Sequence, residues 1–300
     1  MTLAALAVAV FAPARAAAPA RAAEPSRTAA PRESLVAETP TARIYRLTLV
    51  APSGHPTRAM LRMPRDTTAA PACGIVLVGG FRNGWRAAEL VEPGPGFALL
   101  SIDYPYEGRR TGIPPLEYLT RAAAFWRATR ETSDLLLAAG DFLARRPGVD
   151  STRLAIVGGS LGAPFALHAA GRSRRFGAVG VLYGSADLGD WVARNLRGVP
   201  RWLRPGIGWI VAALYRDYEP ERLIPRVHPR PVLLVNGRGD PRISESGALR
   251  LFEAAREPRE QVWLDGQHIK LENEELVRRL LDITLAWLRR IGFAGAGAAG

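Results

Sequence analysis

Six short runs of apolar residues recur along the chain, and helical patterns lie between most of them. Continuous apolar runs of this length are typical of strands that are buried on both faces of a sheet. Strands that alternate with helices form parallel sheets through right-handed crossovers, so we predict an α/β fold with a doubly wound, mostly parallel sheet. The expected strands are Gly74–Gly80, Phe97–Tyr104, Arg153–Gly159, Phe176–Gly184, Arg230–Gly237 and Gln261–Asp265.

The stretch "ARIYRLTLVAPSGHPTRAMLRMP" precedes these runs and predicts an N-terminal antiparallel hairpin around a Pro-Ser-Gly turn. Residues 187–226 interrupt the alternation, because about forty residues are too many for a simple crossover loop. We expect one or two extra helices there, as either an apolar lid over a site or an ordinary crossover with additional packing. The other expected helices are 114–146, 160–171, 245–256 and 273–291.

Both ends of the chain differ in composition from the middle. Leu3–Ala12 is apolar but too short to span a bilayer, and two small-x-small cleavage patterns follow it, although no Lys or Arg precedes it. Residues 1–22 therefore predict a signal peptide and export to the periplasm or medium, with a plain Ala-rich tail as the alternative. We expect a disordered leader over residues 23–40, a folded domain over 41–292 and a flexible tail over 293–300.

The net charge is +12, and Lys270 is the only lysine among 40 basic residues. Clustered basic residues are typical of proteins that bind nucleic acid or anionic lipid. The arginines here are spread along the chain without a block of like charges, which favours a solvated surface and no nucleic-acid partner. Cys73 is the only cysteine, so the sequence excludes an internal disulfide and predicts a buried thiol.

The stretch "VGGSLGAP", Val157–Pro164, contains a Gly-x-Ser-x-Gly motif centred on Ser160. Ser160 lies between an expected buried strand and a helix of small residues, the setting of a nucleophile on a sharp turn. Gly158 and Gly162 would allow the strand and helix to approach closely there. A phosphate-binding loop is disfavoured, because no Gly-Lys-Ser/Thr follows and Gly-x-Gly-x-x-Gly is absent.

A serine hydroxyl needs a base to become a good nucleophile, and the chain has four histidines. His55 lies in the early turn, His168 inside the helix after Ser160, and His228 at the amino end of a strand. His268 follows the last expected strand at its carboxyl end, which is where active sites of α/β sheets lie. We therefore predict that His268 is the base.

The base needs an acid that holds its tautomer. Asp240 follows the penultimate expected strand at its carboxyl end, so the chain order is Ser160, Asp240, His268. This is the Ser–acid–His order of open α/β sheets with a nucleophile on a strand-to-helix turn. Asp187, after the preceding strand, is the rival acid.

A tetrahedral intermediate needs two backbone N–H donors. Leu161, directly after the nucleophile, is expected to supply one. Phe81, in the loop after the first buried strand, is expected to supply the other, with Gly80 permitting close backbone approach. A plain strand-to-helix turn is the alternative interpretation of Gly79 and Gly80.

With these residues in place, residues 42–291 resemble an α/β-hydrolase. The early hairpin and the stretch "SIDYPYEGRR" are similar to dienelactone-hydrolase-like and prolyl-oligopeptidase-like members. The resemblance implies Ser160 as nucleophile, Asp240 as acid and His268 as base. Many members carry His-Gly before the oxyanion residue, whereas this chain has Gly79 in place of the His. This difference concerns the support of the oxyanion loop and does not affect the triad.

These residues predict a serine hydrolase that cleaves a small carboxylic ester through an acyl-enzyme, without a metal or organic cofactor. A peptidase or thioesterase with the same triad is the alternative, and a non-catalytic binding protein on this fold is a second. An oligopeptidase-type peptidase usually has a large extra N-terminal domain, which a short leader does not supply. Trp202, Trp209 and Arg109 are expected at the substrate pocket, with solvated surface as the alternative for Arg109 and Arg110.

Overall fold

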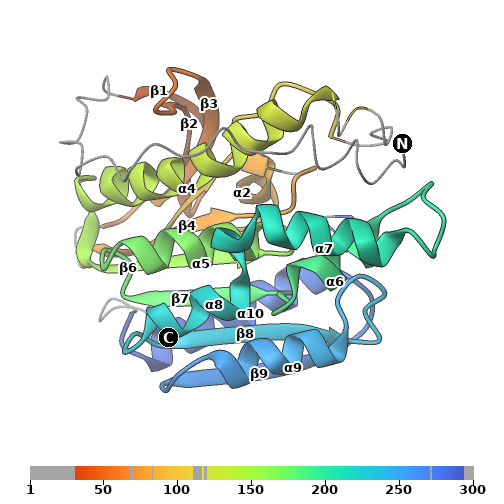
Figure 1. Ribbon diagram of the computed structural model, residues 1–300. Coiled ribbons are helices and arrows are strands. Elements are labelled where there is room, and N and C mark those ends of the chain that lie inside the picture. The colour runs from red at the N-terminus through yellow and green to blue at the C-terminus, as the bar shows by residue number, and fades with distance from the viewer. Residues whose placement is uncertain are drawn as a thin grey trace.

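The computed structural model describes residues 31–67, 70–82, 84–110, 117, 120–270 and 272–293. One nine-stranded sheet organises them, in the order β1-β2-β3-β5-β4-β6-β7-β8-β9 (Figure 1). The expected signal peptide and nearly all of the expected tail lie outside the described residues. The strands are β1 (Arg32–Glu38), β2 (Ala42–Val50), β3 (Pro56–Pro64), β4 (Ala72–Val78), β5 (Phe97–Ile102), β6 (Val149–Gly159), β7 (Ala178–Leu182), β8 (Val232–Arg238) and β9 (Arg259–Asp265).

The sheet is antiparallel at its N-terminal edge and parallel elsewhere. The strands β1, β2, β3 and β5 pair in antiparallel fashion. The strands β5, β4, β6, β7, β8 and β9 pair in parallel. This arrangement confirms the predicted α/β fold with a doubly wound, mostly parallel sheet and an N-terminal antiparallel hairpin, which is β2–β3.

The edge strand β1 corrects the expectation of a disordered leader over residues 23–40. Every residue of β1 is exposed, so its stability comes from backbone pairing with β2 and not from burial. Composition therefore gave no sign of it. The guanidinium of Arg146, just after α4 (Ala122–Ala144), also donates to both carboxylate oxygens of Glu33 at 2.6 and 2.7 Å.

Helices cover both faces of the parallel strands, as Figure 1 shows. One core contains side chains of α4, α5 and α8, and the other contains side chains of α2 and α10. The remaining helices are α2 (Ala87–Leu90), α5 (Gly162–Arg172), α6 (Leu188–Asn195), α7 (Arg204–Leu214), α8 (Pro220–Leu223), α9 (Glu245–Ala254) and α10 (Glu274–Arg290), with 3-10 turns at Gly84–Arg86, Arg216–Tyr218 and Ile224–Val227.

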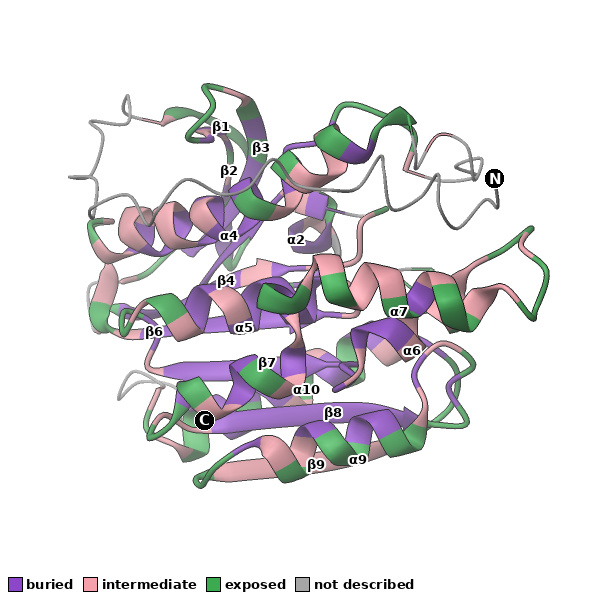
Figure 2. Ribbon diagram, in the orientation of Figure 1, coloured by how far each residue is buried: buried purple, intermediate pink, exposed green. Residues whose placement is uncertain are grey.

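The strand β4 shows why its run is apolar throughout. Val76 and Val78 belong to the core under α4 and α5, whereas Ile75 belongs to the core under α10 and Leu77 packs against it. Successive side chains of a strand point to opposite faces, so a strand covered on both faces has no polar position. Figure 2 shows β7 and β8 buried along almost their whole length.

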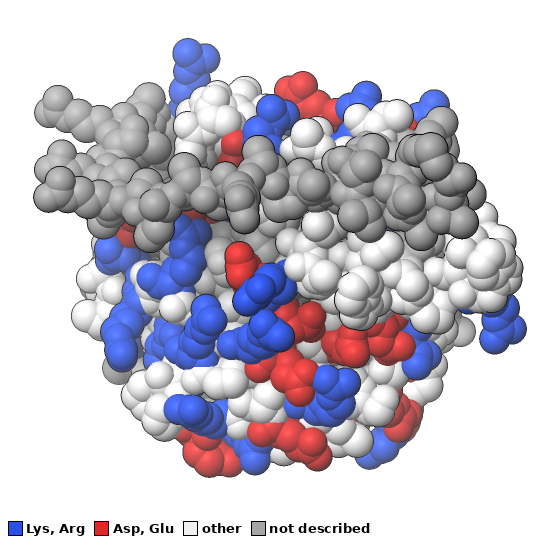
Figure 3. Space-filling view, viewed as in Figure 1, with Lys and Arg blue, Asp and Glu red and all other residues white. Residues whose placement is uncertain are grey.

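The segment between β7 and β8 forms the helices α6 and α7, which pack together through glycines at the carboxyl edge of the sheet (Figure 1). A Cβ on Gly208 would lie only 2.3 Å from the carbonyl oxygen of Gly189. Gly208 is the single buried residue of the apolar helix α7, and Trp202 and Trp209 are 79% and 73% exposed. In Figure 3 the surface over α7 is almost free of charged side chains. Within the described ranges, no helix combines the length and the apolar character needed to cross a bilayer.

Candidate active site

Ser160 lies at the turn between β6 and α5, at the carboxyl edge of the parallel strands. Its φ of 53° is in the left-handed region, which a non-glycine residue adopts when its surroundings impose it. The backbone N–H of Ser160 donates to the carbonyl of Leu182 at 2.8 Å. A Cβ on Gly162 would lie 2.1 Å from the Val78 oxygen, and one on Gly158 would lie 2.6 Å from the Gly162 oxygen. Both glycines are therefore required by the packing of the turn.

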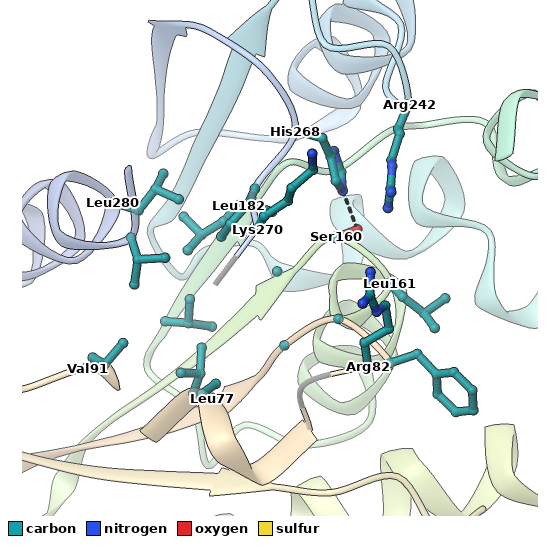
Figure 4. Close-up of a pocket in the computed structure, with 18 of the residues that line it drawn as sticks. Leu77, Arg82, Val91, Ser160, Leu161, Leu182, Arg242, His268, Lys270 and Leu280 are labelled. Atoms are coloured by element: carbon teal, nitrogen blue, oxygen red, sulfur yellow. Dashed lines mark hydrogen bonds between the residues drawn. The ribbon is translucent and has the colours of Figure 1, made fainter. Parts of the chain in front are cut away.

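Three polar side chains form one hydrogen-bonded series at this edge. Ser160 Oγ lies 2.8 Å from His268 Nε2 (Figure 4), and His268 Nδ1 lies 2.6 Å from Asp240 Oδ2. Asp240 follows β8 and His268 follows β9, so the parallel pairing of these strands brings the two residues together. His268 is 4% exposed and Asp240 is 7% exposed. The structure thus brings together the residues that the sequence named as nucleophile, acid and base.

The carboxylate of Asp240 is fixed by the backbone of the turn that follows it. Its Oδ1 accepts the N–H of Arg242 at 2.7 Å and the N–H of Ile243 at 3.2 Å. These contacts orient the carboxylate so that Oδ2 faces His268. Among the described residues, the hydrogen bonds to Oδ1 come from these two backbone groups.

Tyr183 packs against the ring of His268 and supports it, a contact that the sequence did not suggest. It follows β7 with a φ of 56°, and its ring meets the His268 ring edge-on at 5.4 Å. Burial, together with the nearby Asp240, raises the pKa of Tyr183 to about 12, so the phenol stays neutral beside the histidine. Its position directly after a short apolar strand gave no chemical signal.

The loop after β4 carries one expected oxyanion donor, Phe81, and the other, Leu161, directly follows Ser160. Within the described residues, neither the Phe81 N–H nor the Leu161 N–H donates a hydrogen bond, and both residues line the pocket beside Ser160. The hydroxyl of Tyr104 donates to the Gly79 carbonyl at 2.6 Å, and its ring packs edge-on against Phe81 at 5.3 Å. Tyr104 is thus a support of this loop that the sequence analysis missed.

Gly80 differs from the expectation. A Cβ at this position would meet no atom within 4 Å, so close backbone approach does not require glycine there.

Arg110 lies next to this loop, where its guanidinium pairs with Asp103 and sits 5.5 Å from the centre of the Phe81 ring. Arg109 is exposed and does not line the pocket.

The rival acid and one rival base have structural partners elsewhere. Asp187 Oδ1 accepts the Asp190 N–H at 2.8 Å and so caps α6, and its Oδ2 lies 3.5 Å from Arg250. His168 Nδ1 lies 3.0 Å from the hydroxyl of Ser133. Burial lowers the pKa of His168 to about 4.

The two remaining histidines also lie away from Ser160. His55 Nδ1 is 3.5 Å from Glu107, and His228 Nδ1 is 2.8 Å from the Glu257 carbonyl. Within the described ranges, no three His, Cys, Asp or Glu side chains are grouped as a metal site would need.

A pocket of about 530 Å³ opens beside Ser160 and His268. Its walls come from β4, β5, β6, β7, α10 and the oxyanion loop, and α6 contributes Trp191 and Asn195. Trp202 and Trp209, expected at the pocket, do not line it but point to solvent. An aromatic residue in an inserted helix can face solvent as readily as a site, and the sequence pattern did not distinguish the two.

Comparison with solved structures identifies the fold. The chain matches an acetyl xylan esterase from Paenibacillus sp. R4 with a TM-score of 0.62 and 21% identity, over 84% of this chain and 88% of that one. It matches a puromycin-hydrolyzing peptidase of Mycobacterium tuberculosis with a TM-score of 0.60 and 20% identity, over 85% of this chain and 40% of that one. Together with the sheet order and the turn at Ser160, these matches show that the chain has the α/β-hydrolase fold.

The sequence itself gives the family. Residues 119–290 match the prolyl oligopeptidase family, and the chain belongs to this family. The uncharacterized protein YfhR of Salmonella typhimurium is 28% identical over 177 residues, which cover 57% of this chain and 54% of YfhR. The chain thus spans about half the length of the curated relatives it matches.

Proposed function

We propose that the chain hydrolyses carboxylic esters, with Ser160 as nucleophile, His268 as base and Asp240 as acid. One observation carries the proposal. Ser160 Oγ lies 2.8 Å from His268 Nε2 and is presented by strained backbone at the start of α5. A hydroxyl within hydrogen-bond reach of an oriented imidazole, at a helix N-terminus, is the geometry that activates a serine.

In the proposed reaction, His268 Nε2 takes the proton of Ser160 as Oγ attacks the ester carbonyl. Asp240 holds Nδ1–H and stabilises the imidazolium. The N–H groups of Phe81 and Leu161 bind the oxyanion, and His268 then protonates the leaving alcohol. Water, deprotonated by the same histidine, attacks the acyl-enzyme and releases the carboxylic acid.

Hydrolysis of a peptide or a thioester is the alternative use of the same residues. The names of the matched structures include an acetyl xylan esterase and a puromycin-hydrolyzing peptidase, so the fold alone favours neither bond. The part of the pocket between the sheet and α10 favours an ester over a peptide, because its aliphatic side chains offer few groups that could bind a peptide backbone.

The experiment compares p-nitrophenyl acetate, a thioacetate and peptide p-nitroanilides with the wild type and Ser160→Ala, alongside labelling by a fluorophosphonate. We expect labelling and ester turnover that both vanish in Ser160→Ala. A variant that turns over the ester like the wild type would refute the nucleophile. Faster cleavage of peptides than of esters would select the alternative function.

We further propose that the protein is exported. The apolar stretch Leu3–Ala12 and the Ala-Arg-Ala patterns after it support this. Mass analysis of the protein from periplasm and medium should find an N-terminus near Ala16 or Ala22. A full-length chain confined to the cytoplasm would contradict export.

A further inference from the structure

We propose that the substrates are amphiphilic esters: an unbranched aliphatic acyl chain fills an apolar chamber behind Ser160, and an anionic group on the alcohol binds Arg82, Arg242 and Lys270. The inference rests on the ester hydrolysis proposed above and adds the substrate class.

The chamber is the part of the pocket between the sheet and α10. Figure 4 shows Leu77 of β4, Leu182 of β7 and Leu280 of α10 directed into one space, with Val91 on its far side. The walls are completed by Ile75, Leu99, Val157, Val277 and Leu281. This is the face of the sheet opposite to α4 and α5.

The chamber offers almost nothing to a polar ligand. Thr284 of α10 also lines it, but its hydroxyl donates to the Leu280 carbonyl at 2.7 Å and is already bonded. A sugar or peptide group placed there would lose its hydrogen bonds to water without replacement, whereas an alkyl chain loses none. The chamber therefore selects a hydrocarbon chain.

The pocket mouth has the opposite chemistry. Five basic residues line the pocket, and Glu272 is the single acidic residue beside them. Arg110 is paired with Asp103, but Arg82, Arg197, Arg242 and Lys270 form no ion pair with any described carboxylate. Some arginines elsewhere are paired, as Arg146 is with Glu33, and others such as Arg256 form no ion pair with a described carboxylate. The four cations at the pocket are distinguished by their position around the space that a substrate must enter.

Two of these cations, Arg242 and Lys270, lie on the side of the histidine, whereas Arg82 follows Phe81 in the oxyanion loop. Arg242 is two residues after the acid Asp240, and Lys270 is two residues after the base His268, so the turns that place the acid and base also place the cations. Figure 4 shows Arg82 and Arg242 extending toward the part of the pocket that holds Ser160. Because His268 must reach the leaving oxygen, the alcohol lies on this side and the acyl chain in the chamber.

The apolar chamber and the basic pocket mouth would bind two different parts of one substrate. Guanidinium groups bind phosphate or carboxylate by charge-assisted hydrogen bonds, which are stronger than neutral ones. An alkyl chain gains affinity with each methylene that leaves water. An ester with an anionic alcohol and an aliphatic acyl chain satisfies both.

The first test measures kcat/KM for p-nitrophenyl esters from acetate to decanoate below their micellar concentrations. We expect a rise of about threefold for each methylene that enters the chamber, then a plateau. Leu77→Phe and, independently, Leu182→Phe should move the plateau to shorter chains. Leu249→Phe, on the exposed face of α9, is the matched control and should leave the profile unchanged.

The second test compares decanoyl esters of glycerol, glycerate and glycerol 3-phosphate, which share the acyl chain and differ in charge. We expect both anionic esters to exceed the neutral one by about tenfold in kcat/KM. Their ratio to each other distinguishes a carboxylate from a phosphate ligand. The advantage should shrink in Arg82→Gln and Arg242→Gln and at about 0.5 M salt, but not in Arg256→Gln, a substitution after α9 far from the pocket.

These outcomes distinguish a failure of the proposed substrate class from a failure of the proposed ester hydrolysis. Ser160-dependent acetate hydrolysis with a flat chain-length profile, or with equal rates for the neutral and anionic esters, would overturn the inference and leave ester hydrolysis intact. A chain-length effect seen only in alkyl acetates, on the alcohol side, would also overturn it. Absence of both ester turnover and fluorophosphonate labelling would instead remove the proposed function.

Discussion

The Tyr104 hydroxyl donates a hydrogen bond to the Gly79 carbonyl at 2.6 Å and so connects β5 to the loop that carries Phe81. Burial raises the pKa of Tyr104, which keeps the phenol protonated and able to donate. A carbonyl held on one side of the loop fixes the peptide planes that follow it, including the Phe81 N–H.

Tyr104→Phe should therefore lower kcat about tenfold to a hundredfold with little change in KM, because the Phe81 N–H acts on the transition state. The rate of fluorophosphonate labelling should fall in parallel. Tyr45→Phe, in the N-terminal hairpin, is the control for removing a tyrosine hydroxyl. A change in thermal stability with kcat preserved would show that Tyr104 serves only the fold.

Asp240→Asn should reduce kcat by about three orders of magnitude, because an amide cannot stabilise the imidazolium and favours the wrong tautomer of His268. Asp187→Asn should keep activity near that of wild type, since asparagine also caps a helix. Steady-state kinetics on one short ester measure both. Equal losses in the two variants would contradict the assignment of the acid.

Gly162→Ala should destabilise the protein strongly, because the new Cβ would lie 2.1 Å from the backbone oxygen of Val78, which cannot move as a side chain could. A loss of about 3 kcal/mol, or roughly 6–12 °C in melting temperature, is expected. Gly159→Ala, whose Cβ would meet no atom within 4 Å, should melt within about 2 °C of wild type. Similar melting temperatures for the two variants would refute the steric account.

Cys73 should resist thiol reagents in the native protein. It is fully buried, and burial raises its pKa to about 12, so almost no thiolate forms near neutral pH. A disulfide reagent should report no thiol before denaturation and one thiol per chain in guanidinium. Rapid labelling of the native protein would contradict the buried position.

His168 should make the protein less stable in acid. Its pKa in the folded state is about 4, below the ordinary value of about 6.5, so the unfolded chain binds more protons between these values. The free energy of unfolding should fall as pH drops from about 6.5 toward about 4, by at most about 1.4 kcal/mol per pH unit and less after solvent screening. Above about pH 6.5 this contribution is constant.

Urea unfolding of wild type and His168→Gln at about pH 7 and about pH 5 measures the effect. The difference in stability between the two pH values should be smaller in the variant. An identical pH dependence in both proteins would exclude His168 as the acid-sensitive group.

Local pattern predicted much of the fold. The apolar runs became β4 to β9. The strands β4 to β8 are apolar because helices cover both of their faces, whereas the edge strand β9 is only partly buried. Ser160 could be placed from its neighbours in the sequence. The edge strand β1 was not predicted, because all of its side chains are exposed and its sequence therefore lacks the alternation of apolar and polar residues that marks a strand. Tyr104 and Tyr183 were missed because their roles depend on contacts with Gly79 and His268, which sequence spacing does not encode.

The pocket was the least predictable part. Trp202 and Trp209 were the conspicuous aromatics of the insertion, yet the walls beside Ser160 come from ordinary core residues such as Leu77 and Leu280. A leucine that faces a chamber and one that faces another leucine look alike in sequence. Only the position of α10 relative to the sheet separates them.

The backbone turn after Asp240 has an evolutionary consequence. The acid is held by the N–H groups of residues 242 and 243, so a new side chain at position 242 leaves the acid where it is. The charge preference at the pocket mouth thus depends on the side chain of Arg242, whereas the position of the acid depends on its backbone N–H. Single substitutions at position 242 can therefore change which charged substrates the pocket prefers during evolution, while Asp240 keeps its position and the protein stays active.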